Sequence, residues 1–74
     1  MLKEVRERSG MSQSKLAEVS GVKLHMIQFY EQGYRDIDGA RLTTLVKLAK
    51  ALNCSISDLL NDPDLIAECQ EIEI

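Results

Sequence analysis

The stretch from Gln13 to Gln32 constrains the fold of this chain most, because it has the pattern of two short helices joined by a tight turn. Gly21 lies at the turn and can adopt the positive φ that re-aims a chain at a steep angle. Ala17, four residues earlier, is small enough to let two helices cross closely. Apolar residues suited to a core recur around the turn at Leu16, Ala17, Val22, Ile27 and Tyr30. The stretch therefore predicts two helices with a shared buried face.

The rest of the chain also predicts helices. We expect a first helix over 2–8, a second that Ser12 caps and that runs to about residue 19, and a third that ends at Gly33. A fourth helix is expected over about 41–52. A capping box of Ser55 and Asp58 should open a short fifth helix that continues through Leu60. The fourth helix carries an apolar stripe suited to the core: Leu42, Leu45, Val46, Leu48, Ala49 and Leu52. We expect a turn or an extra helical start in the loop 36–40, with Ile37 beneath it.

Length and composition favour one small all-helical domain. The chain has 74 residues, 45% of them apolar and 4% aromatic, with a single proline. No apolar run approaches the roughly 20 residues of a membrane span, and the first residues lack the pattern of a signal peptide. We therefore expect a cytoplasmic protein that does not contact a membrane.

Chemically reactive residues are few. Cys54 and Cys69 are too far apart for a C-x-x-C motif, and His25 is the single histidine, so the sequence predicts no metal site and no cofactor. Reduced, buried thiols are the expected state of both cysteines, with a disulfide or an oxidation sensor as alternatives. No nucleophile and base pair, paired carboxylates or phosphate-binding glycine loop is recognisable, so we expect no enzyme and no catalytic residue.

Charge is distributed unevenly along the chain. The net charge is −3, yet all nine Lys and Arg residues lie within residues 1–50, where six acidic residues leave a net charge of +3. Residues 51–74 carry six acidic residues and no basic one. The acidic average therefore does not exclude a polyanionic partner for the first part of the chain.

Four segments together resemble a known family: L-K-E-V-R-E-R-S-G-M-S-Q-S-K-L-A, the S-G-V turn, Y-E-Q-G-Y-R, and T-L-V-K-L-A-K-A-L-N-C-S-I-S-D-L-L. They are similar to the helix-turn-helix family of phage Cro and repressor proteins, the XRE family, over residues 2–60. The resemblance implies an all-α, five-helix lambda-repressor-like DNA-binding domain over 1–61, with the helix-turn-helix proper at 13–32. It also implies that the third helix enters the major groove of double-stranded DNA and that the protein forms a homodimer.

The resemblance assigns two sets of DNA-contacting residues. The residues at the groove are Lys23, Leu24, His25, Gln28 and Phe29, and those on the phosphate backbone are Gln13, Gln32, Tyr34 and Arg35. Alternative interpretations are an exposed helix residue for Gln13, a solvated surface for His25 and Gln28, and an ordinary loop for Tyr34 and Arg35. In this family a glutamate pairs with an arginine on the first helix, so Arg6 and Glu31 are expected to form a structural ion pair.

The chain departs from the family at three positions. Lys23 stands where Ser or Thr usually caps the recognition helix, and Leu24 and Phe29 are apolar where related repressors have polar residues. Phe29 is either a contact to a thymine methyl group, an anchor for a protein partner, or a core residue. The sequence therefore predicts a sequence-specific transcriptional regulator, a repressor. The alternative is a helix-turn-helix scaffold that binds a protein, such as an antitoxin partner.

Residues 62–74 form a short acidic C-terminal extension. Asp62 and Pro63 suit a helix start, and apolar residues follow at helical spacing, but Glu71 to Ile74 alternates like a strand. The sequence alone offers this segment nothing obvious to bury against. It is therefore predicted to be either a dimerisation segment or a frayed tail.

Overall fold

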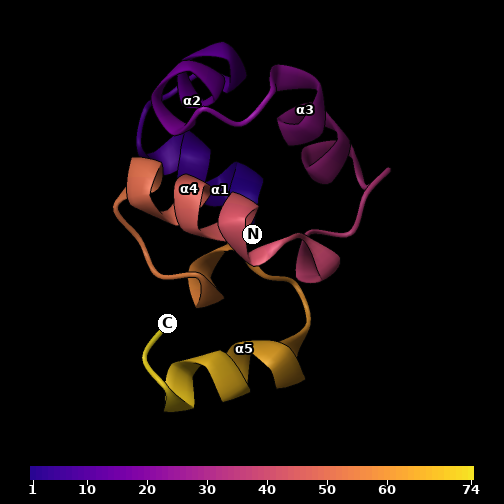
Figure 1. Ribbon diagram of the computed structural model, residues 1–74, viewed down its shortest axis with the longest axis vertical. Helices are drawn as coiled ribbons and strands as arrows, with labels where there is room; N and C mark the ends of the chain where they lie inside the picture. Colours follow the sequence, from indigo (N-terminus) through magenta and orange to yellow (C-terminus); the bar gives the residue numbers. More distant parts are fainter.

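The computed structural model describes residues 1–74 and is entirely helical (Figure 1). Its elements are the helices α1 (Leu2–Arg8), α2 (Gln13–Ser20), α3 (Leu24–Gln32), α4 (Leu42–Leu52) and α5 (Pro63–Glu71), with 3₁₀ turns η1 (Ile37–Gly39) and η2 (Ser57–Leu59). The all-α class with five helices is confirmed, and so are the extra turn in the loop 36–40 and the burial of Ile37. None of the helices has the length and apolar character needed to cross a membrane.

One apolar core joins all five helices. Its completely enclosed side chains include Leu16, Ile27, Leu48 and Leu59. The core residues predicted around the turn behave as expected, because Leu16, Val22 and Ile27 are buried while Ala17 and Tyr30 pack against them from the edge. As a result, α2 is packed against both α3 and α4, and α1 against α3 and η2.

The predicted fifth helix over 55–60 is wrong, since this segment forms only the single turn η2. Half of the expected capping box is present, because the backbone N–H of Ser55 donates to Oδ2 of Asp58 at 3.1 Å. The Ser55 hydroxyl, however, is hydrogen-bonded to the Ser57 hydroxyl at 2.8 Å. Leu60 adopts an extended backbone (φ −86°, ψ 162°) that ends the turn, and both Leu59 and Leu60 reach the core.

The burial predicted for α4 is wrong at two of its six residues. Leu42 is 65% exposed and Val46 is 46% exposed. Leu45, Leu48, Ala49 and Leu52 already form a complete stripe at i, i+3, i+4 and i+7, and this stripe faces the core. Leu42 and Val46, one turn apart, lie beside that stripe. They leave an apolar strip on the molecular surface.

The acidic extension is neither a strand nor a frayed tail. Asp62 caps α5 by accepting from the backbone N–H of Asp64 at 2.9 Å, and Pro63 occupies the first turn, where it needs no N–H partner. Cys69 is only 8% exposed, and Leu65 and Ile66 pack against the core. The expectation that this segment has nothing to bury against is therefore wrong, because α5 packs on η2.

Both cysteines are free thiols, Cys54 half-buried and Cys69 buried. Burial raises the pKa of the Cys54 thiol above its ordinary value.

Figure 1 shows that α5 lies at the end of the molecule opposite α2 and α3. The acidic part of the sequence is therefore separated in space from the helix-turn-helix.

Candidate nucleic-acid interface

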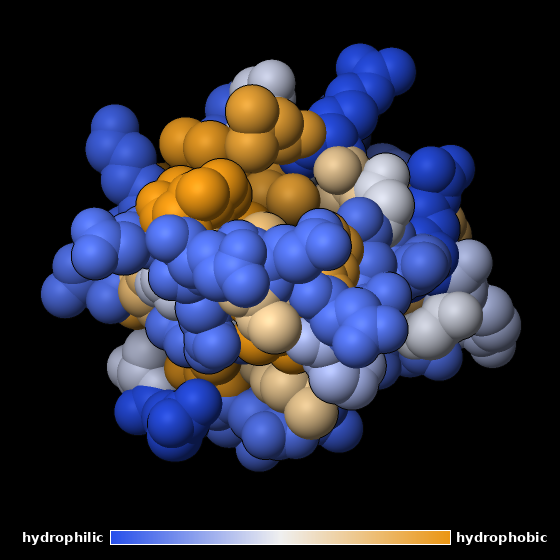
Figure 2. Space-filling model, turned by 90° about the horizontal axis from the view of Figure 1, so that it is seen from below, coloured by the Kyte–Doolittle hydropathy of each residue, from blue (hydrophilic) through white to orange (hydrophobic).

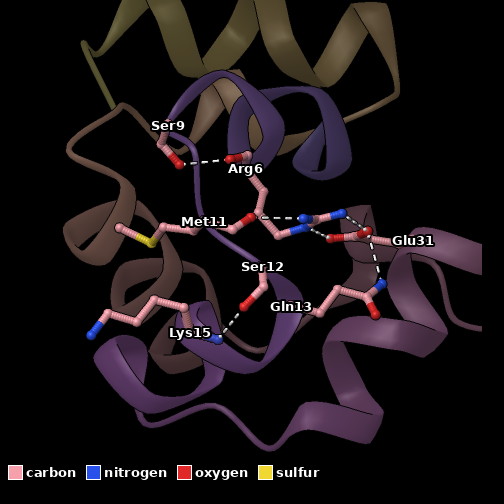
Figure 3. A network of polar contacts seen from close by, with 7 residues as sticks. All are labelled: Arg6, Ser9, Met11, Ser12, Gln13, Lys15 and Glu31. Atoms are coloured by element: carbon pink, nitrogen blue, oxygen red, sulfur yellow. Dashed lines mark hydrogen bonds and ion pairs between the residues drawn. The ribbon is translucent and has the colours of Figure 1, made fainter.

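A polar network centred on Glu31 fixes α3 to the elements that precede it (Figure 3). Arg6 donates from Nε to Oε2 of Glu31 at 2.7 Å and from Nη2 to Oε1 at 2.9 Å. Its Nη1 donates to the carbonyl oxygen of Met11 at 2.8 Å. Gln13 Nε2 donates to Oε1 of Glu31 at 3.0 Å. One carboxylate thus connects α1, α2 and α3, and the predicted ion pair between Arg6 and Glu31 is confirmed.

The ion pair is buried and charged. The Arg6 side chain is 11% exposed and that of Glu31 only 2%. Burial by itself would raise the pKa of Glu31, but the hydrogen bonds from Arg6 and Gln13 outweigh burial and lower this pKa below its ordinary value. The hydrogen bond to Glu31 also raises the pKa of Arg6. Because the guanidinium nitrogens are used inside the domain, this arginine holds α3 in place rather than binding a ligand.

The turn between α2 and α3 sets the direction of α3. Gly21 has the predicted positive φ of 77°, and its N–H donates to the carbonyl oxygen of Ala17 at 2.9 Å. The N–H of Val22 donates to the Ser20 hydroxyl at 3.1 Å. Val22 and Ile27 are then buried, at 7% and 0% exposure. With this face of α3 fixed inward, the opposite face is turned outward.

The five predicted groove residues lie on that outward side or at the start of α3. Lys23 and His25 are exposed, Leu24 and Phe29 are each 36% exposed, and Gln28 is half-buried. None of them belongs to the hydrophobic core, so the interpretation of Phe29 as a core residue is wrong. No three His, Cys, Asp or Glu side chains lie together in an arrangement that could hold a metal ion.

Three of the four residues predicted to contact the phosphate backbone of DNA are exposed, and the side chain of the fourth is hydrogen-bonded inside the domain. Gly33, with φ of 82°, ends α3 and leads into Tyr34, which is 76% exposed, and Arg35. Gln32 is exposed as well. Gln13 is half-buried, and its side-chain amide donates to Glu31. In this structure the Gln13 amide therefore belongs to the network that positions α3.

The structure adds Arg41 to the candidate phosphate-contacting residues, although the sequence patterns do not single it out. A hollow beside the end of α3 is lined by Met26, Tyr30, Arg35, Gly39, Ala40, Arg41 and Thr44. Two guanidinium groups therefore border the same surface, one from the loop after α3 and one from the start of α4. In the sequence, the position of Arg41 indicates only the beginning of a helix. The signal that could identify it is a cation at an N-cap position, as at Lys23.

The helices α3 and α4 share an unusual start. Neither Lys23 nor Arg41 provides a side-chain acceptor for the first free N–H groups of its helix, in agreement with the departure predicted at Lys23. By contrast, the Ser12 hydroxyl accepts from the N–H of Lys15 at 3.0 Å and caps α2. Uncapped N–H groups beside a cation favour an anion such as a phosphate. Both helix starts thus have the chemistry of a phosphate contact.

The carboxylate of Asp38, near the predicted backbone contacts, is turned away from them. It accepts from the backbone N–H of Asn61 at 2.7 Å and from that of Asp62 at 3.1 Å. Asp36 accepts from the N–H of Asp38 at 3.0 Å and so caps η1. Asp38 therefore ties the loop to the start of α5, and its charge is directed to the acidic end of the molecule.

Comparison with known proteins agrees with this geometry. The family profile described as helix-turn-helix matches residues 2–59. The chain is 34% identical over 71 residues to the HTH-type transcriptional regulator PuuR of Escherichia coli K12, and equally to that of Shigella flexneri. The matched region is 96% of this chain but 37% of each relative. No solved structure gave a significant match. The chain belongs to the Cro/repressor-type, or XRE, helix-turn-helix family of DNA-binding proteins.

Proposed function

We propose that this chain binds a specific sequence of double-stranded DNA and thereby regulates transcription, with α3 in the major groove and α2 crossing above the backbone. The observation that carries the proposal is the network around Glu31, because it holds α3 rigidly on one face and leaves the other face open. A reading element needs this combination, since base edges are recognised only at fixed positions.

The contacts divide into two sets. Lys23, Leu24, His25, Gln28 and Phe29 face the groove, while Gln32, Tyr34 and Arg35 meet the backbone, and Arg41 joins them. Gln13 contributes differently, because its side chain orients Glu31, while the N–H groups of Gln13 and Ser14, which Ser12 does not cap, face the phosphate. Glu31 is the only carboxylate on α3, and since Arg6 neutralises it, α3 does not repel DNA.

Regulation by repression is the mode that this arrangement supports best. The relatives that match this chain are named as transcriptional regulators. A protein that occupies an operator blocks transcription by its presence alone, so the DNA-binding geometry is sufficient for repression. Activation would require an additional contact with the transcription machinery.

A homodimer is part of this proposal. Leu42 and Val46 form an exposed apolar strip on α4, and Ile72 and Ile74 are exposed beyond α5, at 68% and 38%. Figure 2, which looks onto the α5 end, shows an apolar area beside a hydrophilic surface. A second copy of the chain that covered the strip on α4 would leave both α3 helices free to meet two half-sites one helical turn apart. Val46→Asp should therefore shift the chain toward the monomer in sedimentation analysis.

The experiment that tests the function is a selection from random DNA duplexes with the 74-residue chain at moderate salt. Enrichment of one sequence, followed by tight binding to that duplex and weak binding to a shuffled one, is the expected result. If no sequence is enriched, sequence-specific DNA binding is wrong. The Leu24→Ala variant, which folds if its helical circular dichroism matches the wild type, should bind the enriched duplex less tightly.

Binding to a protein partner is the second candidate, because Leu24 and Phe29 are exposed where polar readers are expected. A partner such as a toxin would then contact the outer face of α3 itself. Affinity purification of the chain from its native cell, with and without nuclease, distinguishes the two. A partner that stays bound after nuclease treatment, and that is lost in Phe29→Ala, would support this function.

A further inference from the structure

Phe29 is held between two other aromatic rings. The ring of His25, one helical turn earlier, lies 5.7 Å from that of Phe29 at an interplanar angle of 73°. The ring of Tyr34 lies 6.1 Å away at 89°. Both contacts are edge-to-face, one of the two arrangements that aromatic pairs prefer. Contacts with both neighbouring rings therefore stabilise the position of the Phe29 side chain on the outer face of α3.

The chain path after α3 creates the second of these contacts. Gly33 takes a positive φ of 82° and reverses the chain, and the N–H groups of Tyr34 and Arg35 both donate to the carbonyl oxygen of Phe29, at 2.9 and 3.2 Å. These bonds return Tyr34 to the side of Phe29. They also bring the backbone of Arg35 next to that of Phe29. The end of α3 thus carries an aromatic cluster with a cationic residue next to it in the chain.

The outer face of α3 carries no exposed carboxylate that would repel DNA. Leu24, exposed to the same extent as Phe29, is the other apolar side chain of the outer face, and His25 lies between them in sequence. The one carboxylate of α3, Glu31, is buried against Arg6. Cations stand at both ends of α3, at Lys23 and Arg35. This combination of an apolar centre with cationic ends fits a groove lined by phosphates.

The apolar group that the major groove presents is the C5 methyl of thymine. Hydrogen-bonding side chains recognise the other groups at the base edges, but Leu and Phe cannot. Resting on the function proposed above, we propose that Leu24 and Phe29 read C5 methyl groups, so that thymine is specified where α3 meets the groove. A 5-methylcytosine carries the same methyl group at the same ring position and would be accepted better than cytosine.

The proposal is tested with the duplex enriched in the selection described above. Each thymine is replaced in turn by deoxyuridine, which keeps the base pairing and removes only the methyl group. We expect about a fourfold loss of affinity at one or two positions, the effect of one buried methyl group. In Phe29→Ala this loss should disappear at the position that Phe29 contacts, and Phe29→Leu should retain part of it.

Two controls make the outcome decisive. Val19→Ala removes an exposed apolar side chain of α2 outside the cluster and should keep the full response to deoxyuridine. Phe29 lies outside the core, so the variants should keep the helical circular dichroism of the wild type. If a sequence is enriched but deoxyuridine changes affinity by less than roughly 1.5-fold at every position, methyl reading is wrong while the proposed function stands. If no sequence is enriched, the proposed function fails first.

Discussion

The two faces of α3 are held in different ways. On the inner face, Ile27 is completely buried and the Glu31 side chain, 2% exposed, receives three hydrogen bonds from Arg6 and Gln13. On the outer face, Leu24 and Phe29 remain 36% exposed. The inner face therefore defines where the helix lies, whereas the outer face can change without loss of the fold. This separation lets one scaffold carry different specificities.

The largest effect should come from breaking the inner face. Arg6→Met leaves the Glu31 carboxylate buried without its cation, and we expect a loss of about 3–5 kcal/mol in the free energy of unfolding. For a domain of this size, that loss is comparable with the whole stability. Urea unfolding followed by circular dichroism measures it.

The control for this prediction replaces both partners. Arg6→Met combined with Glu31→Met removes the unpaired charge and fills the space with apolar atoms, so most of the stability should return. Gln32→Ala, on the exposed side of the same helix, should change stability by about 0.5 kcal/mol or less. A single Arg6→Met variant within about 1 kcal/mol of the wild type would show that the network does not fix α3.

Acid should lower the stability of the domain through the Glu31 carboxylate on the same face of α3. The hydrogen bonds from Arg6 and Gln13 lower the folded-state pKa of Glu31 below its ordinary value of 4.5. A lowered carboxyl pKa stabilises the fold above the unfolded-state pKa, and the stabilisation is lost as pH falls through the folded-state pKa. Below pH 4.5, therefore, the wild type should lose stability relative to the double Met variant in urea unfolding. Parallel pH profiles of the two proteins would contradict the role of Glu31.

A smaller effect is expected at the turn that orients α3. Gly21 has a φ of 77° with no other atom close to the position of a Cβ, so Gly21→Ala meets backbone strain alone. We expect a loss of about 1–2 kcal/mol in unfolding free energy. Gly39→Ala is the matched control, because Gly39 also has open space but no positive φ. Equal stability of the two variants would mean that the turn tolerates other residues.

The inner face could be predicted from the sequence and the outer face only in part. The apolar spacing around Gly21 is local, so the sequence alone is sufficient to assign Leu16, Val22 and Ile27 to the core. The ion pair of Arg6 with Glu31 spans 25 residues, and its prediction depends on resemblance to a family. Spacing along a helix cannot show which residues meet across the fold.

The errors have the same physical origin. The period of α4 gives a wide apolar stripe, but only the packing of neighbouring elements decides that Leu42 and Val46 stay exposed. Two segments, at Ser55 and at Asp62, both carry the signals of a helix start. The second forms α5 because Cys69 and its neighbours find a place against the core. Arg41 is absent from the predicted contacts since only the tertiary arrangement places it beside the same hollow as Arg35.

The outer face should respond to changes that leave the fold intact, and the smallest expected effect is on salt dependence. Arg35→Ala removes one proposed phosphate contact, so the slope of log K against log salt should fall by about 0.9, the value for one phosphate on duplex DNA. All sequences should be weakened alike, unlike in Phe29→Ala. Arg8→Ala removes the same charge on α1, beside Cys54 and Asp58 and away from α3, and should leave the slope unchanged. Fluorescence anisotropy across a salt series gives both slopes, and equal slopes for the two variants would place Arg35 outside the DNA contact.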